Sequence, residues 1–352
     1  MSTNRLDLPS ADSAIVVLID GLGAEVLKAR AGHARTLMSA LSAKSIIESG
    51  FPTTTAAAIA TLTTGVSPGQ HGLVGYTVLD SHGRMVNQLS GWDAQLDPAS
   101  WQLRPTIFER ASDAGLSPIV VGPERYRESG FTKAVLRGAR YVTGASIAER
   151  MQHAAALARA PGSLLYVYVP ELDQAAHAHG WQSPEWTNAL ESTDSALAEL
   201  QRSLGPRTGL LVTADHGVLD VDRGSHILID SAPELIDGVR YVAGEPRCLQ
   251  LHFEPNLSPS LRADLTDRWR ASESHRAWVV TRSEAIVAGW FGPVDPLVEP
   301  RIGDLLVAAR KNVAYYDGRA GASGRSMIGQ HGSWSAAELR VPLLRFGAFA
   351  RA

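Results

Sequence analysis

Four short runs of apolar and β-branched residues recur in the first two thirds of the chain, and helical patterns separate them. The runs AIVVLIDG, SPIVVG, SLLYVYVP and GLLVTADHG occupy residues 14–21, 117–122, 163–170 and 209–217. Continuous apolar runs of this length are typical of strands buried on both faces of a parallel sheet. Because the strands alternate with helices, they predict an α/β fold with a doubly wound, mostly parallel sheet and helices on both faces.

The pattern changes after about residue 222. From there to about residue 324, strand-like and helical stretches mix without the regular alternation, and a final strand-like run, LRVPLLRF, closes the chain. We therefore expect residues 1–222 and 325–352 to form the main unit and residues 223–324 to form a smaller α+β insertion or cap. A chain of 352 residues can bury roughly three quarters of its unfolded surface without covalent cross-links.

The composition excludes several classes of protein and of site. A formal net charge of -3 gives no basic surface for nucleic acid or for an anionic membrane. The single cysteine, Cys248, excludes an intrachain disulfide and a cysteine cluster around a metal. The polar N-terminal segment lacks the features of a secretory signal, and no apolar run reaches about 18 residues. We expect a cytoplasmic protein; the sequence does not indicate its oligomeric state.

Acidic and histidine side chains gather where the predicted strands end. Asp20 follows one strand, and the neighbouring pair Asp215 and His216 follows another. Ligands bind beyond the carboxyl ends of the strands in sheets of this kind. Taken alone, Asp20 could equally be a helix N-cap. The adjacent pair favours a metal ion, because a cap needs only one acceptor.

Three more candidate ligands lie elsewhere in the chain. Asp173 and His177 are four residues apart, so they share one face of a helical turn and could reach one cation. A carboxylate that merely faces the positive end of a helix dipole would look the same. His331 lies between glycines in GQHGS, where the backbone can approach a site closely. Nitrogen and oxygen ligands suit Zn, Mn or Fe, and six of them are about right for two ions.

A threonine-rich segment supplies a candidate nucleophile. FPTTTAAAIATLTTG, at residues 51–65, holds six threonines. Pro52 fixes an extended approach, so a helix should begin among Thr53, Thr54 and Thr55. Thr53 or Thr54 could simply be an N-cap. A threonine at a helix N-terminus also lies beside free N–H groups that bind phosphate, and two metal ions about 3.5–4 Å apart would activate its hydroxyl for attack on phosphorus.

Together these motifs resemble those of the alkaline phosphatase superfamily, and within it those of the type I phosphodiesterase/nucleotide pyrophosphatase family. The succession is VLIDG, FPTTTAAAIATLTTG with SPGQHGLVGY, PELDQAAHAHG, TADHG and GQHGS, which spans residues 14–333. The resemblance implies an alkaline phosphatase-like fold and a hydrolase with two divalent metal ions, usually zinc. It also implies a covalent phospho-enzyme intermediate.

The resemblance further implies a role for each candidate residue. One ion would be held by Asp20, Asp215 and His216, and the other by Asp173, His177 and His331. In the family, the nucleophilic Ser or Thr precedes the Thr of a Thr-Gly pair by nine positions. Counting back from Thr64 of Thr64-Gly65 selects Thr55 as the nucleophile.

Two departures from the family pattern bear on the substrate. Nucleotide pyrophosphatases commonly carry an aromatic residue after the nucleophile and an Asn after the next motif, where this chain has Ala56 and Tyr76. Tyr76 or Asn87 would then be the candidates for binding the substrate's phosphate oxygen. The arginine with which phosphomonoesterases of the superfamily grip a dianion has no recognisable counterpart.

We therefore expect a hydrolase that cleaves phosphodiester or pyrophosphate bonds in a small-molecule phosphate ester through a phospho-threonine. One alternative is a phosphomonoesterase or phosphonate hydrolase that uses the same metal ions. An alternative of another class is a non-catalytic metal-binding protein that retains the fold.

Overall fold

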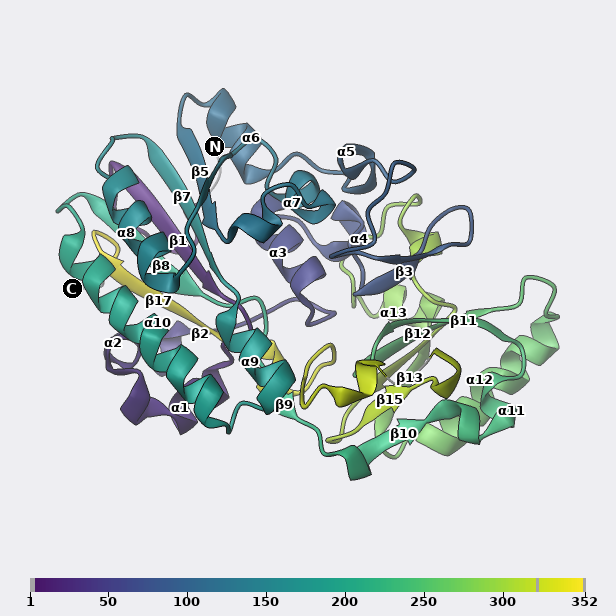
Figure 1. Cartoon of the computed structure of the whole chain (residues 1–352). Coiled ribbons are helices and arrows are strands. Elements are labelled where there is room, and N and C mark those ends of the chain that lie inside the picture. Colours follow the sequence, from purple (N-terminus) through teal and green to yellow (C-terminus); the bar gives the residue numbers. More distant parts are fainter. Residues whose placement is uncertain (1–3, 321–322, 351–352) are drawn as a thin grey trace.

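The structure, a computed structural model, describes residues 4–320 and 323–350. Its main sheet has seven strands in the order β2-β17-β8-β1-β7-β5-β6 (Figure 1). The strands are β1 (Ser13–Ile19), β2 (Ile46–Glu48), β5 (Ser117–Gly122), β6 (Arg140–Thr143), β7 (Ser163–Val169), β8 (Thr208–Thr213) and β17 (Arg340–Gly347). The five from β8 to β6 run parallel, whereas β17 is antiparallel to both of its neighbours.

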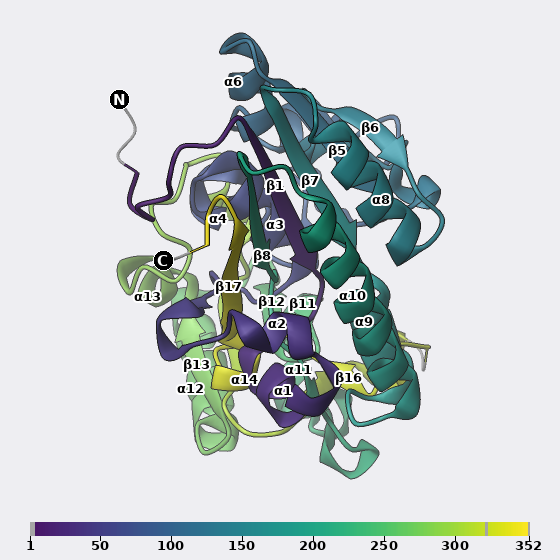
Figure 2. The ribbon, with the colours of Figure 1, turned by 90° about the vertical axis from the view of Figure 1, so that its left-hand side faces the viewer.

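Helices cover both faces of this sheet, which confirms the predicted fold class. Figure 2 shows α8 and α10 on one side of the sheet and α3 on the other. One face packs against α1 (Ala24–Ala29), α2 (Arg35–Ser39), α8 (Ile147–Leu157), α9 (Glu171–His179) and α10 (Pro184–Ser203). The other face packs against α3 (Thr55–Thr64), α6 (Ile107–Asp113) and α7 (Gly130–Val135).

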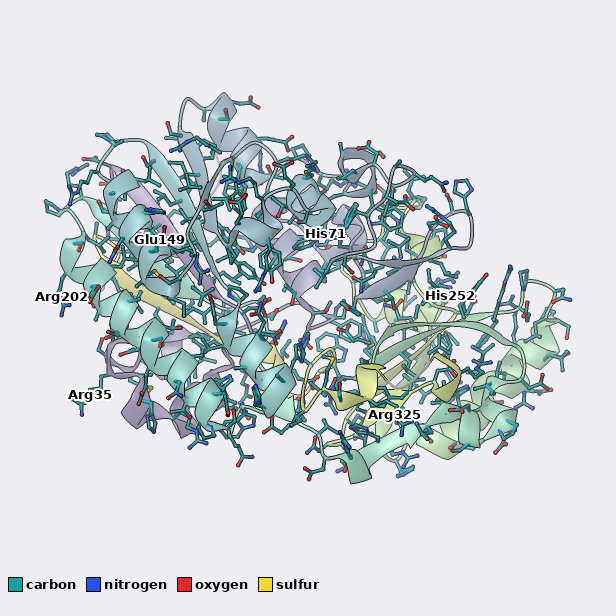
Figure 3. All side chains as sticks on the ribbon, in the orientation of Figure 1. Arg35, His71, Glu149, Arg202, His252 and Arg325 are labelled. Atoms are coloured by element: carbon teal, nitrogen blue, oxygen red, sulfur yellow. The ribbon has the colours of Figure 1, made fainter. Side chains whose placement is uncertain are left out.

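Strand β1 shows why a continuous apolar run in the sequence predicts a strand that is buried on both faces. Ile15, Val17 and Ile19 point into the core on one face of the sheet, and Leu18 points into the core on the other. Successive side chains of a strand alternate between faces, so a strand covered on both sides needs an unbroken apolar run. Charged side chains such as those of Arg35, Glu149 and Arg202 lie instead on the outer surface of the helices (Figure 3).

A second sheet of six strands lies beside the first and is antiparallel throughout (Figure 1). In order, its strands are β13 (Ala277–Thr281), β14 (Leu305–Ala309), β12 (Cys248–Phe253), β11 (Val239–Glu245), β3 (Thr77–Leu79) and β4 (Met85–Asn87). Helices α11 (Pro233–Ile236) and α12 (Pro259–Glu273) pack on it and α13 (Arg282–Val287) follows β13.

Two strands of the second sheet come from the first part of the chain. Thr77 of β3 pairs with Gly244 of β11, so the segment 77–87 joins the sheet that residues 223–324 otherwise build. The division into 1–222 with 325–352 and 223–324 stays a prediction. Residues 1–3, 321, 322, 351 and 352 of those segments lie outside the described residues.

Short elements complete the fold. The helices are α4 (Pro68–His71), α5 (Pro98–Trp101) and α14 (Ala336–Leu339). The strands form two pairs, β10 (His226–Leu228) with β15 (Ala314–Tyr316) and β9 (Leu219–Asp220) with β16 (Gly329–Gln330). None of the helices in the described ranges combines the length and apolar character needed to cross a lipid bilayer.

Candidate metal centre and nucleophile

The carboxyl ends of three neighbouring strands bring the predicted ligands together. Strands β8, β1 and β7 are adjacent in the main sheet. Asp20 directly follows β1, and its backbone N–H donates to the carbonyl of Val169 at the end of β7 (2.9 Å). Asp215 and His216 follow β8, and α9, which begins just after β7, carries Asp173 and His177. The edge of the sheet therefore collects side chains that lie far apart in the sequence.

Asp173, His177 and His331 form one compact group. Their ligand atoms all lie within 4.8 Å of one another. His177 Nε2 is 3.0 Å from Asp173 Oδ2, and His331 Nε2 is 3.9 Å from Asp173 Oδ1. His331 reaches the group from the loop after β16, which pairs with β9 beside α9.

The other three predicted ligands, Asp20, Asp215 and His216, also lie close together. His216 Nε2 lies 3.5 Å from Asp20 Oδ1 and 3.6 Å from Asp215 Oδ2. Asp173 lies close to this group as well, because one of its oxygens is within 4.8 Å of ligand atoms of Asp20 and His216. The His216 and His331 rings stack with their centroids 3.6 Å apart. All six side chains thus form one continuous cluster.

In all three histidines, a hydrogen bond at Nδ1 turns Nε2 towards the cluster. The Nδ1 atoms of His177, His216 and His331 lie 2.7, 3.0 and 2.8 Å from the carbonyl oxygens of Gly329, Gly217 and Thr53. A carbonyl can only accept, so each Nδ1 carries the proton and each Nε2 of a neutral ring presents its lone pair to the cluster. Metal-binding histidines are usually held in this way.

Unpartnered carboxylate oxygens show that the cluster fits a cation. Asp20 Oδ1, Asp173 Oδ1 and Asp215 Oδ2 are buried and have no hydrogen-bond partner. A buried charged group without a partner costs several kcal/mol. Divalent ions between these oxygens and the imidazole nitrogens would supply the missing partners. The set contains only nitrogen and oxygen donors, which suits Zn, Mn or Fe.

The pKa shifts within the cluster also favour a bound cation. Burial raises the pKa of Asp20 well above its usual value, and the charges of Asp215 and Asp173 raise it further. Burial lowers the pKa of His331 well below its usual value, and His216 adds to that effect. The neutral imidazole that results is the form that binds metals. Clustered carboxylates repel one another, and bound cations would relieve that repulsion.

Thr55 is brought to the same cluster by α3. It is the first residue of the helix, and its Oγ1 lies 3.2 Å from His216 Nε2. Thr54 occupies the N-cap position, but no side chain caps the helix there. The N–H groups of the first turn therefore remain available to an anion. A phosphate held there would lie beside the Thr55 hydroxyl.

Thr54 is the N-cap residue of α3, as expected for one of the two threonines, but neither the Thr53 nor the Thr54 hydroxyl caps the helix. Thr53 Oγ1 donates to the carbonyl of Ser333 (2.7 Å) and accepts from the N–H of Gly332 (3.0 Å). Thr54 donates instead to the carboxyl of Glu245. Both hydroxyls fasten the start of α3 to other segments, because the loop after His331 and strand β11 pack directly against it.

Glu245, at the end of β11, has no signal in the sequence. It is a lone Glu before Pro in GEPR, and its place beside the cluster follows only from the fold. Gly332 has a φ of +131°, and a Cβ there would lie 2.5 Å from Glu245 Cγ. A glycine is therefore required next to His331. Burial raises the pKa of Glu245 to about 8.

We expect Glu245 to make the stability of the metal-free protein depend on pH. The folded protein holds this proton more tightly than the unfolded chain, whose pKa is near 4.5. The protonated Glu245 carboxyl therefore makes its full contribution to the free energy of unfolding below pH 4.5. That contribution is lost as the pH rises towards 8, by up to about 1.4 kcal/mol per pH unit. Glu245→Gln should flatten this slope in denaturant unfolding at pH 5, 6.5 and 8. Equal slopes in wild type and variant would contradict the assignment, and exposed Glu234→Gln is the matched control.

A buried ion pair supports the loop that carries His331. Arg247 Nη2 and Glu338 Oε2 are 2.7 Å apart, and both side chains are fully buried. The other oxygen of Glu338 accepts from the N–H of Ser333 (2.9 Å). Because Ser333 in turn accepts from Thr53, the pair links the second sheet to the start of α3.

Strand β7 adds two tyrosines that were not singled out from the sequence. Tyr168 Oη donates to Asp20 Oδ2 at 2.5 Å and so helps to orient a predicted ligand. Tyr166 lies two residues earlier, on the same face of the strand, and its ring stacks on that of Tyr168 at 6.5 Å. The sequence did carry a signal for this pair. In YVY, at residues 166–168, the two tyrosines are two positions apart, and residues i and i+2 of a strand share a face.

Tyr76 and Asn87 are placed differently. The Tyr76 side chain is exposed. Asn87 Oδ1 accepts from the N–H groups of Leu89 and Ser90, at 2.9 and 3.1 Å, and so holds a turn. Within the described residues, neither side chain hydrogen-bonds to Thr55 or to the six candidate ligands. Their role in substrate binding stays a prediction.

Known proteins share this arrangement at the level of the fold. The structure superposes on an inactive threonine-to-alanine variant of murine ectonucleotide pyrophosphatase/phosphodiesterase 5 in complex with AMP. That match has a TM-score of 0.72 and 16% identity, and it covers 96% of this chain and 88% of that one. It also superposes on phosphonoacetate hydrolase from Sinorhizobium meliloti in complex with phosphonoacetate, with a TM-score of 0.74, 19% identity, and 98% and 92% coverage.

The sequence itself identifies the family. Among curated proteins, none matches the chain. A profile of the family described as type I phosphodiesterase / nucleotide pyrophosphatase matches residues 14–334, and this range contains every candidate ligand and Thr55. The chain therefore belongs to the type I phosphodiesterase/nucleotide pyrophosphatase family.

Proposed function

We propose that the protein hydrolyses phosphodiester or pyrophosphate bonds through a covalent phospho-threonine on Thr55. The observation that carries this proposal is the place of the Thr55 hydroxyl. It lies 3.2 Å from His216 Nε2, at a helix N-terminus that no side chain caps. A candidate nucleophile, a helix N-terminus able to bind phosphate and a set of candidate metal ligands are thus neighbours, and this supports the proposal.

We further propose that the cluster holds two divalent ions, with zinc preferred and manganese or iron as alternatives. Asp20, Asp215 and His216 would hold one ion, and Asp173, His177 and His331 the other. Bound ions of this kind lower the pKa of a nearby hydroxyl and neutralise charge on phosphate oxygens. The chain would add the N–H groups of the first turn of α3, which donate to phosphate oxygens.

The reaction then consists of two displacements at phosphorus. Thr55 Oγ1 loses its proton to solvent and attacks phosphorus, its bond to phosphorus forms, and the bond to the leaving oxygen, which keeps the electron pair, breaks on the opposite side. In the second step, the oxygen of a water molecule attacks phosphorus, the bond to Thr55 breaks, and the proton released by the attacking water balances the one that the threonine regains. Burial of the cluster strengthens each electrostatic contact, because water does not screen it.

The charge around the site favours diesters over monoesters. Across residues 4–320 and 323–350, no Lys or Arg forms a hydrogen bond or ion pair with Thr55 or with the six candidate ligands. A phosphomonoester is a dianion near neutral pH, whereas a phosphodiester, like the ester of a phosphonate, carries one negative charge and needs less cationic help. The likeness to a phosphonoacetate hydrolase keeps phosphonates among the alternatives to be measured.

A substrate panel tests this function. Protein loaded with zinc or with manganese is assayed on bis(4-nitrophenyl) phosphate, 4-nitrophenyl phosphate and 4-nitrophenyl phenylphosphonate. We expect kcat/KM for the diester to exceed that for the monoester at least tenfold, a difference of about 1.4 kcal/mol in transition-state stabilisation. A monoester or phosphonate that is cleaved faster would reverse the assignment. Fewer than about one bound ion per chain, without turnover, would favour a non-catalytic protein.

A further inference from the structure

A small pocket opens beside Thr55 on the side of α3 and β7. It has a volume of about 90 Å³. Its lining includes Thr55 and a set of mostly apolar and aromatic side chains from α3, β5, β7 and the segment around α7. The aromatic members are Tyr126, Phe131, Tyr141, Tyr166 and Tyr168. No charged side chain lines it, so the pocket suits an uncharged group.

The position of Thr55 decides which part of a substrate can enter. In an in-line displacement, the leaving group departs on the side of phosphorus opposite the nucleophile. Thr55 itself forms part of the pocket wall, so a group opposite its hydroxyl points away from the pocket. The group that remains on phosphorus projects sideways from the reacting line and lies beside Thr55. The pocket is therefore placed to hold the retained ester group.

The volume limits the size of that group. An apolar cavity of about 150 Å³ is known to hold one benzene molecule, and this pocket is smaller, although it opens beside the nucleophile. Ala56, which follows Thr55, is buried and gives the retained group no aromatic surface. Such a space holds a short alkyl group, or a single ring of which one edge remains in the open mouth beside Thr55. A nucleoside, with a base and a sugar, does not.

Tyr166 supplies a polar contact inside a pocket whose other hydroxyl groups already have hydrogen-bond partners. Its side chain is 3% exposed, and its hydroxyl has no hydrogen-bond partner. Tyr168, on the same strand face, has its hydroxyl committed to Asp20. A buried donor without a partner is costly, and an acceptor atom on a bound group would remove that cost. Tyr166 is therefore positioned as a donor to the occupant of the pocket.

We propose that the pocket selects diesters whose retained group is compact, uncharged and no larger than about one ring, and that Tyr166 donates a hydrogen bond to an acceptor on that group. This inference rests on the proposed diesterase function. It predicts that nucleoside esters are poor substrates, although relatives in the family are named for nucleotides.

Three diesters with one leaving group test the size limit. Each releases 4-nitrophenolate and retains a methyl, a phenyl or a thymidine-5′ group. We expect kcat/KM for the phenyl ester to exceed that for the thymidine ester at least tenfold, about 1.4 kcal/mol. Turnover with the thymidine ester equal or faster overturns the inference and leaves the proposed function standing. No turnover of any of the three overturns the proposed function, and the inference with it.

A filled pocket gives a second readout. Leu136, in the pocket wall, is replaced by tryptophan. Leu136→Trp should lower the ratio of phenyl-ester to methyl-ester kcat/KM at least tenfold, because only the larger group needs the space. The matched control Leu261→Trp, on the exposed surface of α12, should leave the ratio unchanged. An unchanged ratio in folded Leu136→Trp would place the retained group elsewhere.

The role of the Tyr166 hydroxyl needs its own comparison. A pyridin-3-yl ester resembles the phenyl ester in size but carries an acceptor nitrogen. The wild-type protein should prefer the pyridyl ester at least threefold, and Tyr166→Phe should bring the ratio of pyridyl-ester to phenyl-ester kcat/KM close to one. A merely structural tyrosine would lower both rates together. A preference that persists in Tyr166→Phe, or that wild type lacks, overturns the assignment of the donor. If Leu136→Trp does not fold, the wild-type panel and Tyr166→Phe still decide the proposal.

Discussion

Thr55→Ala is expected to abolish turnover and to leave the metal content unchanged. The substitution removes the only atom of Thr55 that can bond to phosphorus, and water at the same place lacks its fixed position. Loss of a catalytic nucleophile lowers turnover by at least about 10³-fold. Because the Thr55 side chain does not cap α3, the helix should still form. Steady-state kinetics on the preferred diester and metal analysis of the same sample would measure both properties.

Two further variants serve as controls for this result. Thr55→Ser keeps a hydroxyl at the same position and should retain measurable turnover. Thr63→Ala removes another buried hydroxyl of α3, which donates only within the helix, to Ile59 and Ala60, and should leave the rate near that of wild type. If Thr55→Ala keeps more than a few per cent of the wild-type rate, Thr55 is not the nucleophile. A phosphorylated species trapped on the wild-type protein and absent from Thr55→Ala would add direct support.

Asp173→Asn should release metal and reduce kcat/KM by about 10³-fold. Asp173 lies between the two groups of candidate ligands and comes within 4.8 Å of members of both. Although burial raises the pKa of this carboxyl, His177 outweighs that effect and holds the pKa below its usual range, so the side chain is ionised. The amide removes that charge. Electrostatic stabilisation by bound metal is worth several kcal/mol, and each 1.4 kcal/mol is about tenfold in rate.

Metal content is the decisive measurement for Asp173→Asn. After loading with excess zinc and removal of free ions, the variant should retain fewer ions per chain than wild type. Asp222→Asn, which changes an exposed carboxylate in the segment after β9, should match wild type in both metal content and rate. Full metal content with a normal rate in Asp173→Asn would show that Asp173 is not a ligand.

The main sheet and the cluster could be predicted because both leave local marks in the sequence. Strands β1, β5, β7 and β8 are continuous apolar runs, since each is buried on two faces. Five of the six candidate ligands follow those runs within a few residues, so the expected topology places them at one edge, whereas His331 reaches it from the loop after β16. Thr55 was selected by its spacing from Thr64, and α3 indeed begins at that residue.

The second sheet could not be predicted in full because its pairing depends on distant contacts. Strands β3 and β4 have three residues each, too few for a periodic pattern. Their hairpin is closed by Asp80, whose Oδ1 accepts the N–H groups of His82 and Arg84 at 2.8 Å. In the sequence, such a turn cannot be told from an ordinary surface loop. Only the pairing of Thr77 with Gly244 in the folded chain makes it part of the second sheet.

The supports of the site were hidden for a related reason. Arg247 and Glu338 are 91 residues apart, and neither stands in a motif. The role of Glu245 likewise follows only from its contacts with Thr54 and Gly332 in the folded chain. Side chains that position a site are chosen by their neighbours in space, so a single sequence carries little trace of them.

The shared second sheet makes the chain a poor candidate for modular engineering. Excision of residues 223–324 would strip β3 of its partner strand and leave an open sheet edge, which is a template for aggregation. The same cut would remove Glu245 and Arg247, and with them part of the fastening of the nucleophile's helix. A cap grafted from a relative would have to reproduce those contacts as well as its own fold. Point exchanges in the wall of the pocket beside Thr55 are therefore the practical route to a new substrate range.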